Sequence, residues 1–159
     1  MSEKQAILEK LKQVRETLTA YVIELGEEQW ETAVYSDEPQ TIWTVADLFR
    51  HVVDSEQGMT SLMQHILESG VGVPDDFDLT RWNARRVEKT RQKTPTDLIQ
   101  EMAVNRHNLL QFIDTLAPDD WPKAGLHSSM RVLTIAQICH LIADHEQSHL
   151  AEMQKALPK

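Results

Sequence analysis

The sequence contains one cysteine, five glycines and no long hydrophobic run among its 159 residues. A single cysteine, Cys139, cannot form an internal disulfide bond. A membrane-spanning helix needs about 18 or more consecutive apolar residues, and no segment of this kind or apolar N-terminal signal is present. We therefore expect a cytoplasmic protein that does not interact with membranes.

Basic residues are also scarce, with 16 Lys and Arg against 25 Asp and Glu and a formal net charge of −9. Without a basic stripe, binding to the phosphate backbone of a nucleic acid is disfavoured. The low glycine content and the frequent Leu, Glu, Gln and Ala favour helix over sheet. The length suits one compact domain over residues 1–159.

Apolar residues recur every three or four positions in four long segments, which is the pattern of amphipathic helices. Thr44, Thr94 and Thr134 are predicted to cap the last three segments, and Pro95 fits a first helical position. A shorter helix is expected before the third long one, and no strand is expected. The fold class is therefore predicted to be all-α, a four-helix bundle with a short extra helix. The predicted helices cover residues 3–25, 44–69, 94–117 and 134–157, with the short one at 80–91.

The last segment contains two histidines in the sequence His145-Glu-Gln-Ser-His149. Residues four apart project from one face of a helix, and both histidines fall on the apolar stripe, so they can hold one metal ion. A third ligand is needed, and His51 is the natural candidate. If the second and last long helices are antiparallel, the early turn with His51 lies beside the late turn with His149. The alternative is that these are ordinary core histidines bonded to neighbours.

The other four histidines are not expected to join this site. His65 lies about 21 Å further along its helix than His51. His107 and His140 fall off the inward stripes, and His127 is assigned to a loop. We interpret these last three as solvated residues or residues at the rim of a pocket.

The same pentapeptide matches the HExxH motif of zinc metalloproteases. The extended motif fails, because Glu152 stands where glycine is required and Lys155 where the third histidine should be. A peptide substrate also needs a strand to pair with, and none is predicted. We therefore expect that this protein is not a peptidase.

Glu146 projects close to the apolar stripe, where an unpaired carboxylate is costly. One possibility is a catalytic role as general base. Another is contact with a ligating imidazole, or with Arg85 or Arg86. A third is an ordinary surface glutamate.

Three segments in this order resemble the DinB/YfiT-like superfamily. They are residues 43–51 (Trp-Thr-Val-Ala-Asp-Leu-Phe-Arg-His), 77–86 (Phe-Asp-Leu-Thr-Arg-Trp-Asn-Ala-Arg-Arg) and 139–153, which contains both inward histidines. The resemblance implies a four-helix bundle with one divalent metal ion, commonly Zn²⁺ or Ni²⁺. By position, the implied ligands are His51, His145 and His149. Ser148 departs from the pattern, since many members have a histidine there.

Some members of that superfamily act with low-molecular-weight thiols, bacillithiol or mycothiol, as S-transferases or a maleylpyruvate isomerase. The resemblance thus implies a metal-dependent enzyme with a small-molecule substrate, either a thiol S-transferase or a hydrolase, and we expect a homodimer. Asn83, Arg85 and Arg86 are candidate cofactor-binding residues, because a guanidinium can hold a carboxylate. The alternative is a non-catalytic, stress-related bundle that binds a metal or small ligand, with Glu152 as fourth ligand.

Overall fold

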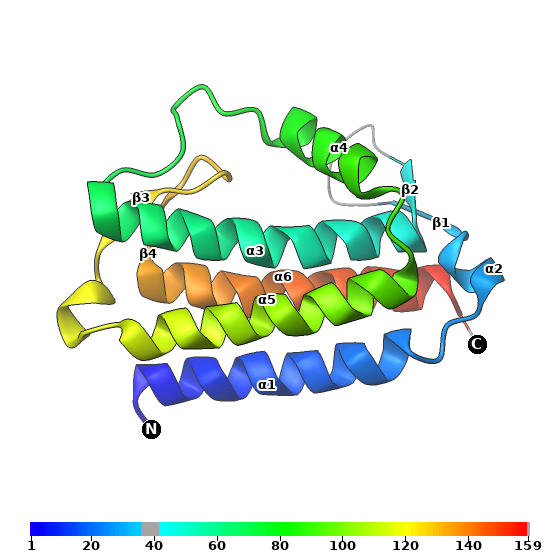
Figure 1. The fold of residues 1–159 in the computed structure, drawn as a ribbon, viewed down its shortest axis with the longest axis horizontal. Helices are drawn as coiled ribbons and strands as arrows, with labels where there is room; N and C mark the ends of the chain where they lie inside the picture. The colour runs from blue at the N-terminus through cyan, green and yellow to red at the C-terminus, as the bar shows by residue number, and fades with distance from the viewer. Residues whose placement is uncertain (36–41, 159) are drawn as a thin grey trace.

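Four long helices form a bundle in the computed structural model, which describes residues 1–35 and 42–158 (Figure 1). The predicted all-α class and four-helix bundle are confirmed. None of the described helices is long and apolar enough to cross a membrane. The bundle helices are α1 (Glu3–Val22), α3 (Val45–Ser69), α5 (Pro95–Thr115) and α6 (Ile135–Ala156).

The direction of the helices follows from one long connection. The chain leaves α3 at one end of the bundle and returns over α3 through α4 (Leu79–Thr90) before α5 begins at the other end (Figure 1). As a result α3 and α5 run in one direction, and α1 and α6 in the other. The predicted extra helix before the third long helix is therefore confirmed, with its first turn capped by Asp78.

Side-chain caps fix where three bundle helices begin. The hydroxyls of Thr44, Thr94 and Thr134 each accept a hydrogen bond from the backbone N–H three residues later, as predicted. At the other end of α3, Gly70 adopts φ 76°, a left-handed conformation that favours glycine. The prediction for the first helix was too long, because α1 ends at Val22 and a short helix, α2 (Glu27–Trp30), follows.

The expectation of no strands was wrong, because two short antiparallel hairpins lead into helices. Strand β1 (Ala33–Tyr35) pairs with β2 (Ile42–Thr44), and β3 (Ala124–Leu126) pairs with β4 (Val132–Thr134). Helix α3 begins directly after β2, and α6 directly after β4. Strands of three residues are too short to show the alternating pattern that identifies a strand in sequence. A 3-10 turn, η1 (Pro118–Asp120), precedes the second hairpin.

The segment after α3 packs tightly against the second hairpin. The backbone N–H of Val73 donates to the carbonyl of Leu126, at 2.8 Å. A Cβ atom on Gly72 would lie 1.9 Å from that same carbonyl oxygen, so only glycine fits this approach. The second hairpin is thereby held against the end of α3.

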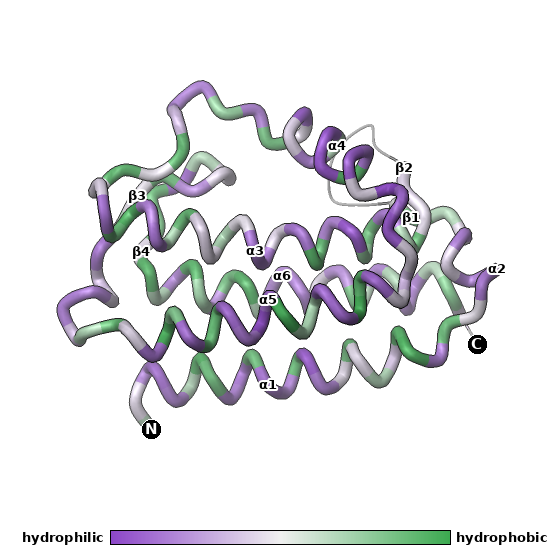
Figure 2. The backbone as a smooth tube through the Cα atoms, in the orientation of Figure 1, coloured by the Kyte–Doolittle hydropathy of each residue, from purple (hydrophilic) through white to green (hydrophobic). Residues whose placement is uncertain are grey.

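The bundle core is divided into two hydrophobic clusters. Along each long helix hydrophobic and hydrophilic residues alternate (Figure 2), and the apolar ones face inward. One cluster contains Leu18, Phe49, Val53, Met102 and Leu150, and the other contains Leu11, Met59, Leu109, Ile142 and Ala143. Between the two clusters lies a layer of four charged residues, one from each bundle helix: Arg15, Glu56, Arg106 and Glu146. We refer to these four residues as the ionic layer.

Candidate metal centre

Helices α3 and α6 bring three histidines together. Nε2 of His145 lies 3.0 Å from Nε2 of His51 and 3.0 Å from Nε2 of His149. One nitrogen from each ring falls within a group whose atoms all lie within 4.8 Å of one another. His51 and His149 are buried, and His145 is partly buried. These are the three residues that the sequence predicted to meet.

The local fold explains this convergence. The cap at Thr44 starts α3 so that His51 lies two turns into the helix. Because α3 and α6 run antiparallel (Figure 1), that turn lies beside the late turns of α6. The Trp43 ring packs on His51 at a centroid distance of 5.2 Å and covers it from the side of the first hairpin.

Burial keeps two of the three imidazoles neutral. Nδ1 of His149 lies 3.0 Å from the Glu152 carboxylate, which can only accept, so Nδ1 carries a proton, and in the neutral ring Nε2 has the lone pair. Burial and the nearby His149 lower the pKa of His51 to about 3. Burial is also the main cause that lowers the pKa of His145 well below its usual value. His51 and His145 are therefore neutral near neutral pH, and each can offer one lone pair.

The spacing of these nitrogens fits a single metal ion. Nitrogens bound to one ion at about 2.0–2.1 Å lie roughly 2.9–3.4 Å apart, for ligand angles between a right angle and a tetrahedral one. The two separations of 3.0 Å from Nε2 of His145 fall in this range. Three imidazoles that converge in this way suit a divalent ion with imidazole affinity.

Glu152 contacts the outer nitrogen of its histidine. Its Oε1 pairs with Nδ1 of His149, whereas Nε2 of the same ring points to the centre. A carboxylate in this position orients the ring and raises its basicity. Within residues 1–35 and 42–158, no fourth His, Cys, Asp or Glu joins the group of three.

Glu146 lies in the ionic layer. Its side chain is 2% exposed, and its Oε1 accepts hydrogen bonds from Nη2 of Arg15 at 2.7 Å and of Arg106 at 3.3 Å. The predicted contact with Arg85 or Arg86 and the alternative of a surface position are therefore both wrong. The actual partners, Arg15 and Arg106, lie 131 and 40 residues from Glu146 along the chain, so sequence spacing could not predict them. A catalytic role for Glu146 stays a prediction.

The three candidate cofactor-binding residues have different surroundings. Arg86 makes a two-pronged ion pair with Asp54, at 3.0 and 2.7 Å, and lies 5.8 Å from the centre of the Trp82 ring. Asn83 is buried, and Arg85 is exposed. Because Asp54 already neutralises Arg86, Arg85 is the better candidate to hold an anionic group.

The other histidines lie outside the group of three. His65 and His107 are exposed and His140 is partly exposed. His127 is buried at the turn of the second hairpin, against the expectation of a solvated or rim residue. Its Nδ1 accepts a hydrogen bond from the backbone N–H of Ser129, at 3.0 Å. The turn folds back on itself and buries His127, which sequence periodicity could only assign to a loop.

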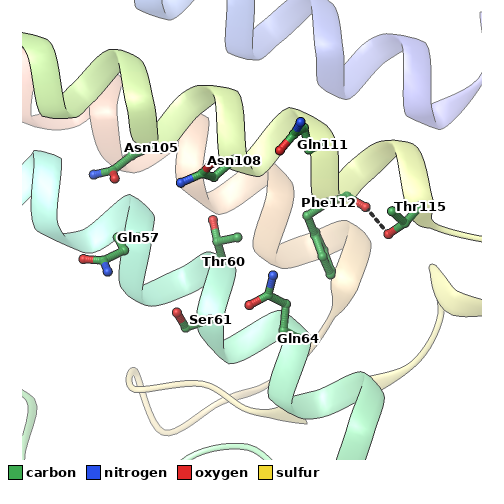
Figure 3. A pocket seen from close by; sticks show the side chains of 9 residues that line it. All are labelled: Gln57, Thr60, Ser61, Gln64, Asn105, Asn108, Gln111, Phe112 and Thr115. Carbon is green, nitrogen blue, oxygen red and sulfur yellow. Dashed lines mark hydrogen bonds between the residues drawn. The ribbon is translucent and has the colours of Figure 1, made fainter.

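A polar groove lies elsewhere on the bundle, between α3 and α5 (Figure 3). Its volume is about 430 Å³, and its lining includes the amides of Gln57, Gln64 and Asn108 and the ring of Phe112. No charged residue or histidine lines it. The groove therefore offers no imidazole, thiolate or carboxylate ligand for a transition metal.

The fold and the geometry of the site define the class of this protein. It is a four-helix bundle with a centre of three histidines. The family model of the DinB superfamily matches residues 10–153. The chain therefore belongs to the DinB superfamily. No curated protein matches it.

Four solved chains match in structure. One is YfiT from Bacillus subtilis, a probable metal-dependent hydrolase with an unusual four-helix bundle topology, with 18% identity and a TM-score of 0.75 over 98% of this chain and 89% of that chain. Another is a mutant of the mycothiol-dependent maleylpyruvate isomerase, with 14% identity and a TM-score of 0.71 over 96% of this chain and 63% of that one. At these identities the likeness establishes the shared fold.

Proposed function

We propose that this protein is a mononuclear metal-dependent enzyme that acts on a small molecule, with His51, His145 and His149 as the metal ligands. The observation that carries the proposal is the meeting of three imidazole rings, in which Nε2 of His145 lies 3.0 Å from Nε2 of both His51 and His149. Zn²⁺ and Ni²⁺ are the proposed ions, since both bind imidazole well. The likeness to a probable metal-dependent hydrolase supports this assignment.

Among the described residues, the number of protein ligands matches a catalytic metal site better than a structural one. Structural zinc sites are closed by four protein ligands, whereas catalytic sites have three and leave a position open. Only three ligands meet in the described part of the chain, and Glu152 is engaged with Nδ1 of His149. The fourth-ligand role of Glu152, which a non-catalytic bundle would require, is therefore disfavoured.

The chain's own residues would bind, orient and shield the reacting groups. When bound, the divalent ion supplies a Lewis acid that activates a thiol or a water molecule as nucleophile. Glu152 orients His149, and Trp43 limits the entry of solvent beside His51. Arg85, an exposed residue of α4, is our candidate to attract an anionic substrate or thiol cofactor. The Arg15 and Arg106 contacts of Glu146 argue against its use as a proton acceptor.

Two reaction classes follow from this chemistry, thiol S-transfer and hydrolysis. One relative is named a probable metal-dependent hydrolase, which supports hydrolysis, and the other a mycothiol-dependent isomerase, which supports the use of a thiol. The deciding experiment first measures the metal content of the purified protein and of the variants His51→Ala, His145→Ala and His149→Ala. The metal-loaded protein is then screened with low-molecular-weight thiols plus electrophiles, and with ester and amide substrates.

We expect one ion per chain in the native protein and its loss in each histidine variant. Turnover that requires a thiol would assign an S-transferase, and turnover without one a hydrolase. A protein that binds no metal, or variants that bind it as the native protein does, would refute the proposal. Stoichiometric metal without turnover of any substrate would favour the non-catalytic alternative.

A further inference from the structure

The ionic layer connects all four bundle helices through two guanidinium groups and two carboxylates. Arg106 of α5 contacts Glu56 of α3 through Nε at 3.2 Å and Nη2 at 2.8 Å. Arg15 of α1 contacts Glu146 of α6 through Nε at 3.2 Å and Nη2 at 2.7 Å. Each Nη2 also reaches the other carboxylate, so the four side chains form one network.

The same two arginines join α1 and α5 to each other. Nη1 of Arg15 donates to the carbonyl of Met102 on α5, at 3.0 Å. Nη1 of Arg106 donates to the carbonyl of Leu11 on α1, at 2.9 Å. This reciprocal pair matters because α1 packs mainly on α6, and α5 mainly on α3. The layer thus bridges the side of the bundle where close helix packing is weakest.

The layer adjoins the candidate metal centre on both helices that supply its ligands. On α6, Glu146 follows His145 directly and precedes His149 by three residues. On α3, Glu56 lies five residues after His51, a rise of about 7.5 Å along the helix. Any axial shift of α3 against α6 would therefore move the carboxylates and the imidazoles together.

A hydrophobic stripe alone defines this register poorly. Apolar side chains repeat at each turn, so a sliding helix can exchange one apolar contact for another, whereas a shifted charge would lose its buried partner. A metal site tolerates displacements of only about 0.5 Å. Buried polar groups are known to specify register in helical assemblies, sometimes at the expense of stability.

We propose that the ionic layer positions the metal centre, by fixing the register of α3 against α6 so that the nitrogen of His51 meets those of His145 and His149. The layer's residues are positioning residues and do not contact the metal. This inference rests on the proposed function, because it requires the three histidines to bind an ion. It gives the buried charges a role in binding the metal in addition to their effect on stability.

The test replaces the whole layer with apolar residues of similar size, in a variant carrying Arg15→Met, Glu56→Leu, Arg106→Met and Glu146→Leu. Such replacements of complete buried ion networks often preserve or raise stability. Metal-free native and variant proteins are titrated with Ni²⁺ and Zn²⁺ by competition with a chelator, and folding is followed by circular dichroism. We expect a folded variant whose dissociation constant for both ions is at least about tenfold weaker, the usual range for residues that orient ligands. A folded variant with a dissociation constant within about twofold of the native value would overturn the proposal.

If the quadruple variant does not fold, two single variants decide the question. Glu56→Gln disturbs the layer, and Leu109→Ala creates a cavity in the core one turn from Arg106 on α5. We expect a weaker dissociation constant for the metal in Glu56→Gln than in Leu109→Ala when the two variants are compared at an equal loss of stability. Equal binding would refute it. Failure of the native protein itself to bind metal would refute the proposed function, whereas native binding with unchanged variants would refute only the positioning role.

Discussion

The histidine centre and the ionic layer are neighbouring buried polar clusters that differ in how their charges and lone pairs are satisfied. In the ionic layer two guanidinium groups face two carboxylates, and the protein supplies both donors and acceptors. In the histidine centre Nε2 of His145 lies 3.0 Å from Nε2 of both His51 and His149. The first cluster pairs opposite charges within the chain, whereas the second gathers like groups that we propose bind a cation.

Burial alone therefore does not distinguish a structural cluster of polar residues from a functional one. Both clusters lie in the same core, and both are expensive to desolvate. A network whose groups pair with one another stabilises one arrangement of the helices. A convergence of buried imidazoles with lowered pKa values is instead typical of a binding site.

The largest expected effect comes from breaking the ionic layer on one side only. Glu146→Leu removes a carboxylate and leaves Arg15 without its two-pronged partner, so we expect a loss of about 3–5 kcal/mol in the free energy of unfolding. Urea denaturation of the metal-free protein measures it. Asp144→Asn, which removes an exposed partner of Lys10 on the same helix, is the control and should lose less than about 1 kcal/mol. Similar losses in the two variants would show that the layer is no more important than a surface ion pair.

Removing a ligand from the histidine centre should affect the metal-loaded protein far more than the metal-free one. A metal at about 100 times its dissociation constant stabilises the native state by roughly 2.7 kcal/mol, and we expect His149→Ala to lose this gain. Thermal unfolding with and without Ni²⁺ measures the difference. His140→Ala, a partly exposed position on the same helix, should retain the gain. If it too loses the gain, the ligand assignment is wrong.

A smaller effect is expected from the carboxylate behind the metal ligand. Glu152→Gln keeps a hydrogen-bond acceptor beside Nδ1 of His149 but removes its charge. We expect metal affinity to weaken by about 10–100-fold while one ion per chain still binds. Chelator competition gives the dissociation constant. Loss of stoichiometry would instead identify Glu152 as a direct ligand.

The pH dependence of the metal-free protein tests whether the histidines are neutral when folded. The pKa of His51 is about 3 in the folded protein, against 6.5 for an ordinary histidine. The unfolded chain therefore binds the proton more readily, and stability is retained above pH 6.5 and lost as pH falls towards 3. The loss approaches about 1.4 kcal/mol per pH unit for each such group. Urea denaturation between pH 7.5 and 5 should show a shallower decline for His51→Gln than for the native chain, and equal slopes would contradict the burial of a neutral His51.

Cys139 should show the smallest effect, because it is a buried group on α6 that has neither a charge partner nor a place in the centre. Burial raises the pKa of its thiol to about 12, and its Sγ lies 3.7 Å from Sδ of Met63. We expect no modification of native protein by iodoacetamide at pH 8, and full modification in urea. Mass spectrometry measures the labelling. Rapid labelling of the native protein would show that this part of the core opens readily.

Local patterns predicted much of the fold. The 3.6-residue periodicity identified the long helices, and the three threonine caps were located because a capping bond spans only three residues. The short hairpins were missed, since three-residue strands carry too little pattern. The four-residue spacing of His145 and His149 likewise predicted that the two rings share a face.

The sequence by itself determined the helices, their inward faces and the pairing of two histidines, because these depend on interactions within a few residues along the chain. Only the tertiary structure decided the partners of Glu146, the burial of His127 and the pairing of Arg86 with Asp54. The partners of Glu146 and the pairing of Arg86 with Asp54 depend on helices that meet across tens of residues, which side-chain spacing cannot predict. The burial of His127 depends on how the second hairpin folds. His51 is an intermediate case. Local sequence pattern predicted which face of α3 it lies on, whereas packing set the register of α3 against α6.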